Sequence, residues 1–129
     1  MIRSGLLNPH VLALLARVRH TNTVVIADSM FPSWTGLPEV DLSLVQGVPT
    51  VPQVLDALLS QWKCGAAWMA SEFVDRGDAA TLREIRETLG FVPLGLIPHA
   101  ALKERVPRAV GLIRTGEARI YTNMILESA

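Results

Sequence analysis

The sequence is poor in residues that form disulfides or bind metals. It contains one cysteine, Cys64, so no disulfide can form within the chain, and we interpret this residue as a small buried hydrophobe. The three histidines, His10, His20 and His99, include no closely spaced pair of the kind that zinc sites use. A disulfide-stabilised fold and a metal centre therefore have no support in the sequence.

Charge is also scarce. Only 19% of the residues are charged, and 12 basic side chains balance 12 acidic ones, which leaves no net charge. A basic patch is the usual sign of nucleic-acid binding, and none is present. No apolar run approaches the roughly 20 residues that cross a bilayer, and the first apolar stretch, broken at Asn8-Pro9, is too short for a signal peptide. We expect a cytoplasmic protein that neither binds nucleic acid nor inserts into a membrane.

Hydrophobic residues, by contrast, make up 50% of the chain. With 129 residues, the chain fits a single domain, residues 1–129, with a substantial core. A surface poor in charge favours an oligomer that hides apolar side chains at subunit contacts. A large core would explain the same composition, so composition alone leaves both interpretations open.

Helical and strand-like patterns alternate along the chain. Asn8-Pro9 and Asp78 are suited to begin helices, and Gly90 is suited to end one. Strands that alternate with helices predict an α/β fold with a layered sheet, mostly parallel with some antiparallel members. The periodicities predict helices over residues 9–18, 51–63, 79–89 and 98–106, and strands over residues 23–27, 40–44, 66–70, 91–97, 109–113 and 120–126.

The first of these strands, Thr23–Ala27, is the centre of the functional prediction. It is apolar and largely β-branched, as strands covered on both faces are. Asp28 follows it, at the end where open α/β sheets bind ligands, and His20 precedes it, at or just past the end of the first helix. We expect both groups to join His99 and the triplet Tyr121-Thr122-Asn123 in one small-molecule site.

Each of these groups also has a structural interpretation. A lone histidine at a helix end is more often structural than catalytic, and Asp28 at a strand end is suited to cap a turn. Lys103 shares a helical face with His99, which usually means a solvated surface. Tyr121 and Asn123, two apart on the expected strand, share one face, as residues at subunit contacts also do.

Other chemistries find no motif in the sequence. There is no Gly-x-Ser-x-Gly turn for a nucleophilic serine and no glycine-rich phosphate loop after a strand. What remains is acid–base chemistry by an imidazole, helped by a carboxylate and by hydrogen-bonding side chains. In the irregular segment 29–36, Phe31 and Trp34 either wall a pocket or anchor the loop to the core.

Several segments in this order resemble the D-ribose pyranase family. The middle of the chain, residues 62–98, diverges from the family pattern, and the tail resembles that of the L-fucose mutarotases of the same superfamily nearly as well. The matching segments are Gly5-Leu6-Leu7-Asn8, His20-Thr21, Val25-Ile26-Ala27-Asp28, Val40-Asp41-Leu42-Ser43-Leu44, Gln46-Gly47-Val48-Pro49, Ile113-Arg114-Thr115-Gly116-Glu117 and Tyr121-Thr122-Asn123-Met124-Ile125-Leu126.

The resemblance implies a three-layer α/β/α domain in a ring-shaped homo-oligomer, typically a decamer, with sites at subunit contacts. It implies an isomerase that interconverts the cyclic forms of a monosaccharide, most directly D-ribose, without cofactor or metal. His20 matches the family's proton donor. The positions that match its sugar-binding groups are Asp28, His99, Lys103, Tyr121 and Asn123.

Departures from the family pattern bear on the choice of sugar. Gln46 stands where the fucose-type enzymes carry an acid and so favours the ribose type, whereas residues 29–36 differ from the ribose pattern, and Thr122 replaces a smaller residue. The alternatives are an L-fucose-type mutarotase, a non-catalytic sugar-binding module that assists a transporter or a kinase, and a purely structural ring protein.

Overall fold

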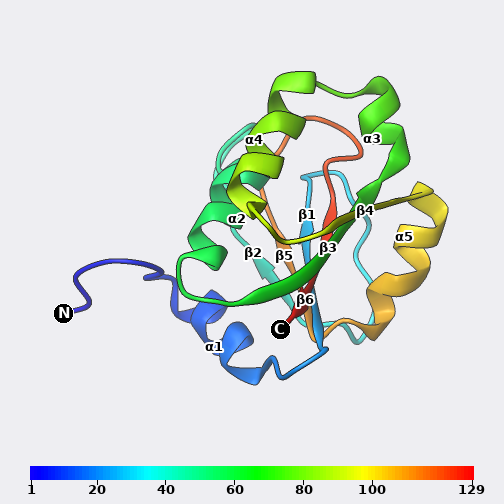
Figure 1. Cartoon of the computed structure of the whole chain (residues 1–129). Coiled ribbons are helices and arrows are strands. Elements are labelled where there is room, and N and C mark those ends of the chain that lie inside the picture. Colours follow the sequence, from blue (N-terminus) through cyan, green and yellow to red (C-terminus); the bar gives the residue numbers. More distant parts are fainter.

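A computed structural model describes all residues, 1–129 (Figure 1). A six-stranded sheet with the order β2-β5-β1-β6-β3-β4 runs through its centre. Strand β6 is antiparallel to β1 and β3, and all other neighbours are parallel, which confirms the predicted α/β fold with a mostly parallel sheet. The strands are β1 Thr23–Ala27, β2 Glu39–Asp41, β3 Cys64–Ala70, β4 Leu94–Ile97, β5 Gly111–Arg114 and β6 Met124–Ser128.

The helices cover both faces of this sheet. Helices α1, α2 and α4 lie on one face, and α5 lies on the other (Figure 1). In β1, Val24 and Ile26 pack into the core cluster under the first group, whereas Val25 and Ala27 pack into a second cluster with α5. The expected three layers are therefore present. The helices are α1 Pro9–Arg17, α2 Val51–Leu59, α3 Ser71–Arg76, α4 Ala79–Leu89 and α5 His99–Arg105, followed by the 3₁₀ turn η1 Val106–Arg108.

The predicted helix caps are present. The side chain of Asn8 accepts hydrogen bonds from the N–H groups of His10 and Val11, and Asp78 accepts one from the N–H of Ala80, all at 3.0 Å. These bonds satisfy N–H groups that have no partner inside the helix. Gly90 ends α4 with a φ of 59°, a conformation that costs glycine little.

Several elements are shorter than the sequence predicts. Helix α2 ends at Leu59 instead of residue 63, because the hydroxyl of Ser60 bonds to a last-turn carbonyl and the chain must turn before β3 begins. Strand β2 keeps only three residues at the sheet edge. Strand β4 begins after Pro93, which has no N–H to donate, and lies at the opposite edge, as its proline indicates.

Two predictions about local structure are wrong. Helix α3 is absent from the prediction, which has a loop over residues 75–78. The closing strand begins at Met124 and not at residue 120, because Tyr121 has a φ of 63°, which is incompatible with a strand. Tyr121 and Asn123 therefore lie in a turn that leads into β6 and do not share the face of a strand.

No helix combines the length and the apolar character needed to cross a membrane.

Candidate active site

A cavity of about 310 Å³ opens where β1 ends, within the size range of small-molecule sites. The carboxyl ends of β1, β3 and β4 share this edge of the sheet, and the antiparallel strand β6 begins there. Four polar residues line the cavity, and four apolar residues form an apolar wall. The polar residues are Asp28, His99, Tyr121 and Asn123, and the apolar ones are Met30, Phe31, Pro32 and Ile120.

Asp28 and Asn123 are joined by two hydrogen bonds. Nδ2 of Asn123 donates to Oδ2 of Asp28 at 3.0 Å, and its Oδ1 accepts from the N–H of Asp28 at 2.7 Å. The N–H of Met30 donates to the other carboxylate oxygen at 3.0 Å. Burial raises the pKa of the Asp28 carboxyl, and the bonds from Met30 and Asn123 offset only part of that rise. The pair thus forms a rigid, buried acceptor site.

His99 is the first residue of α5, and Glu72 holds its backbone. The N–H of His99 donates to both carboxylate oxygens of Glu72, at 3.0 and 3.1 Å. Pro98, the residue before the helix, provides no side-chain cap. Helix α3 therefore supplies, through Glu72, the cap that fixes the start of α5, and the His99 N–H bond lowers the pKa of the Glu72 carboxyl.

The imidazole of His99 lies between two aromatic rings. Its centroid is 5.8 Å from that of Phe31 and 5.0 Å from that of Tyr121, both in edge-on geometry. Nδ1 is buried without a hydrogen-bond partner. Burial lowers the pKa of His99, and the positive charge of Lys103 one turn later lowers it further. Both effects favour the neutral form of the ring, which accepts one hydrogen bond and donates another.

Tyr121 enters the cavity from a strained turn. A bulky residue with a φ of 63° is uncommon, and such a conformation costs about 1–3 kcal/mol. The turn is closed by the fully buried Thr122, whose hydroxyl donates to the carbonyl of Arg119 at 2.8 Å. Thr122 thus supports the turn and does not line the cavity.

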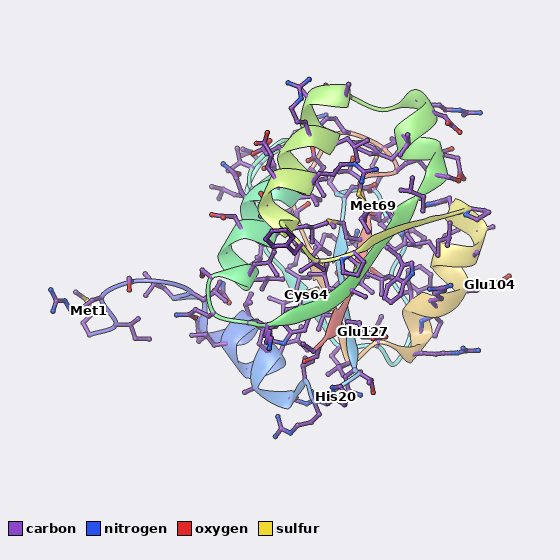
Figure 2. The ribbon with its side chains drawn as sticks, in the orientation of Figure 1. Met1, His20, Cys64, Met69, Glu104 and Glu127 are labelled. Atoms are coloured by element: carbon purple, nitrogen blue, oxygen red, sulfur yellow. The ribbon has the colours of Figure 1, made fainter.

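His20 and Lys103, also expected at the site, do not line the cavity. His20 precedes β1, and a strand rise of roughly 3.3 Å per residue makes the stretch from Thr23 to Asp28 alone about 16 Å long. The side chain of His20 is exposed near the carboxyl end of the chain (Figure 2). There the N–H of Thr21 donates to the backbone carbonyl of Ser128. The expectation that His20 joins Asp28 is therefore not met within one chain, because the rigid β1 separates them. Lys103 is half-buried on α5 beside His99.

The polar residues of the cavity suit a ligand with several hydroxyl groups. Carboxylate, amide, phenol and imidazole groups offer acceptors and donors close together, and the apolar residues of the lining suit C–H surfaces. No group of three His, Cys, Asp or Glu side chains is arranged to hold a metal ion.

Residues 1–129 match the sequence model of the RbsD / FucU transport protein family. The chain belongs to this family. It is 40% identical over 128 residues to the D-ribose pyranase of Geobacillus kaustophilus, covering 99% of this chain and 93% of that protein. It is 36% identical over 130 residues to the D-ribose pyranase of Bacillus licheniformis, covering 99% and 97%.

Solved structures of the RbsD / FucU family have the same fold. The structure of Bacillus subtilis RbsD complexed with D-ribose matches with a TM-score of 0.93 and 28% identity, covering 100% of this chain and 98% of that one. The fucose mutarotase of Streptococcus pneumoniae in complex with L-fucose matches with a TM-score of 0.77 and 23% identity, covering 95% and 92%.

Two residues that shape the site in this RbsD / FucU member are absent from the sequence prediction. Glu72 lies in α3, a helix that the sequence pattern does not indicate, and no local pattern points to it. Arg114 ends the buried strand β5 with only 8% of its surface exposed. A charged residue at the end of an apolar strand, inside a family-like segment, is a pattern that would have identified it.

Proposed function

We propose that the chain is an isomerase that opens and recloses the ring of a monosaccharide, exchanging its pyranose and furanose forms, with D-ribose as substrate. The observation that carries the proposal is the cavity itself, which is lined by the hydrogen-bonded Asp28–Asn123 pair, by His99 and by apolar side chains. Two relatives that match 99% of this chain are D-ribose pyranases.

In this proposal the polar residues hold the sugar hydroxyls. Asp28 accepts hydrogen bonds from hydroxyls with its remaining lone pairs, and Asn123, Tyr121 and His99 supply further contacts. Lys103, one turn after His99, reaches a hydroxyl at the rim. The ring of Phe31 lies against the C–H face of the sugar. Burial of the acceptors in a site of low dielectric strengthens these bonds.

Ring opening requires a proton on the ring oxygen and the loss of one from the anomeric hydroxyl. A histidine with a pKa near neutrality performs such transfers, and general acid–base help of this kind is worth about 10²–10⁴ in rate. The open aldehyde then recloses: attack by the hydroxyl on C5 gives the pyranose, and attack by the hydroxyl on C4 gives the furanose.

We assign the proton donor as His20 of a second copy of the chain. His20 is exposed and cannot reach the cavity of its own chain. The rim of the cavity is apolar and open: Met30 and Ile120 are 62% and 54% exposed. A second cavity of about 340 Å³ adjoins it at Met30 and includes Leu44, which is 77% exposed. These side chains suit a contact between copies in a ring-shaped homo-oligomer.

Mixing two inactive variants tests the shared site. His20→Ala keeps the cavity and lacks the donor, and Asp28→Asn keeps the donor and alters the cavity. In co-assembled rings, about a quarter of the sites combine an intact cavity with an intact donor, so exchange returns to about a quarter of the wild-type rate. No recovery in confirmed mixed oligomers would contradict a shared site.

Saturation-transfer NMR on D-ribose and L-fucose tests the reaction itself. The proposal predicts faster pyranose–furanose exchange of ribose in the presence of the wild-type protein. Acceleration confined to the anomers of fucose would identify an L-fucose mutarotase instead. Saturable sugar binding with no acceleration would indicate a binding module that assists a transporter or kinase.

A further inference from the structure

Arg114 is a buried arginine outside the cavity, and it donates hydrogen bonds to backbone carbonyls of residues that line the cavity. One of its terminal nitrogens, Nη1, donates to the carbonyls of Asp28 and Phe31, at 3.1 and 2.5 Å. Nη2 donates to the carbonyl of Pro32 at 3.3 Å and to the hydroxyl of Ser33 at 3.1 Å. All four acceptors belong to the segment that follows β1, and three of these residues line the cavity: Asp28, Phe31 and Pro32.

Nε of Arg114 binds Glu39 on the edge strand β2, and Nη2 binds the same carboxylate in addition to its contacts with Pro32 and Ser33. Nε and Nη2 donate to the two carboxylate oxygens of Glu39 at 3.1 and 3.0 Å. The bond from Arg114 is the main reason that the pKa of the Glu39 carboxyl is lowered. The bidentate pair neutralises the buried guanidinium and fixes the plane in which its other N–H groups point.

The first part of the segment that follows β1 is also held by Ser29, whose N–H and hydroxyl donate to the carbonyl of Glu117 at 3.0 and 2.8 Å, whereas the carbonyls of the next residues depend on Arg114. The segment contains no helix or strand, and the carbonyls of Phe31 and Pro32 accept hydrogen bonds from no other group. The ring of Phe31 in turn contacts the ring of His99. Contacts therefore connect Arg114 to the backbone of Phe31, and the ring of Phe31 to His99.

We propose that Arg114 is a positioning residue that sets how tightly the site binds its sugar, a role that rests on the proposed function. It does not line the cavity and takes no part in proton transfer. Arg114 holds the apolar wall against the ring face of the sugar. Its loss therefore weakens the binding of the substrate and of the transition state by the same amount. Such a change raises KM and leaves kcat nearly unchanged. A lysine cannot replace it, because one ammonium group lacks the planar set of five donors.

The test compares KM and kcat for ribose exchange in Arg114→Gln, Arg114→Lys and Glu39→Gln. Both Arg114 variants are expected to raise KM at least about tenfold with kcat within about threefold of wild type, since charge-assisted hydrogen bonds order the wall. Glu39→Gln gives a smaller rise in KM. The control is Arg86→Gln on α4, because the exposed side chain of Arg86 makes no hydrogen bond or ion pair, and it leaves both constants unchanged.

Chemical rescue separates positioning from a general loss of structure. In Arg114→Ala, millimolar guanidinium is expected to lower KM towards the wild-type value, whereas the same concentration of sodium chloride has no effect. If the Arg114 variants fail to fold, Ser33→Ala and Glu39→Gln test the same network. A fall in kcat at constant KM, or unchanged constants in folded Arg114→Gln, would overturn the proposal.

An inactive wild-type protein would refute the proposed function and leave the positioning role open to a separate measurement. Hydrogen exchange of the backbone N–H groups of residues 29–36 reports on the wall without any substrate. The proposal predicts faster exchange there in Arg114→Gln than in wild type, with β1 unchanged. Equal exchange in both proteins would refute the positioning role on its own.

Discussion

Replacing Asn123 by aspartate changes one atom of the buried pair and makes stability depend on pH. In the wild type, Nδ2 of Asn123 donates to Oδ2 of Asp28 at 3.0 Å. In Asn123→Asp an oxygen takes the place of that nitrogen, so two carboxylate oxygens meet at hydrogen-bond distance. They can remain there only when they share a proton, as paired carboxylates do. The other bond, from the N–H of Asp28, is unaffected by the change.

The sign and size of the effect follow from the protonation of this pair. The pKa of Asp28 is already raised by burial, and the substitution removes a bond that lowers it. One carboxyl of the pair therefore has a folded-state pKa above its unfolded value. Its stabilising contribution is fully present below the unfolded pKa and is lost as pH rises through the folded one. At pH 7.5 the pair must either stay protonated, although a free carboxyl is ionised at this pH, or lose its hydrogen bond. A buried polar group without its hydrogen bond costs about 3 kcal/mol of stability.

Chemical denaturation at pH 4 and pH 7.5, at one protein concentration, measures this loss. Asn123→Asp should be close to wild type at pH 4 and about 3 kcal/mol less stable than wild type at pH 7.5. Asn123→Ala is the control: it leaves two polar groups of Asp28 unpaired and loses about 2–4 kcal/mol with much weaker pH dependence. A variant with the same stability relative to wild type at both pH values would refute the inference that Asp28 and Asn123 form a buried, bonded pair.

Two further predictions concern His99 and the wall beside it. Glu72→Gln should lower the pKa of His99 further, because the negative charge of Glu72 raises it in the wild type, and NMR titration of the imidazole measures the change; an unchanged or higher pKa would contradict this. Phe31→Leu should cost less than about 1.5 kcal/mol of stability in urea denaturation, since it keeps an apolar side chain at a buried position. The same variant should raise KM for the sugar, because it removes the ring beside His99. An unchanged KM would show that the ring does not contact substrate.

The parts of the fold that the sequence predicts are those with local causes. Strand β1 has the predicted bounds because four of its five residues are apolar and four are β-branched. Helix α4 begins after Asp78 and ends at Gly90, since both residues act within one turn of the helix end. The sequence pattern does not indicate helix α3, because its six residues span less than two turns and lack a side-chain cap.

The arrangement of the site follows from topology more than from local pattern. Asp28 and His99 follow the carboxyl ends of β1 and β4, and Asn123 precedes the antiparallel strand β6, so all three lie at one edge of the sheet. The same rule puts His20, which precedes β1, at the opposite edge. The sequence does not predict the positive φ of Tyr121, because residues other than glycine, asparagine and aspartate rarely adopt it.

Saturation transfer between the pyranose and furanose signals of D-ribose, with wild-type protein and with folded His20→Ala, tests the proposed activity most directly. We expect exchange well above the spontaneous rate with the wild type and a return to the spontaneous rate with the variant. Equal exchange in the two samples would exclude His20 as the proton donor. Exchange at the spontaneous rate with folded, oligomeric wild-type protein would contradict the proposed ribose isomerase activity.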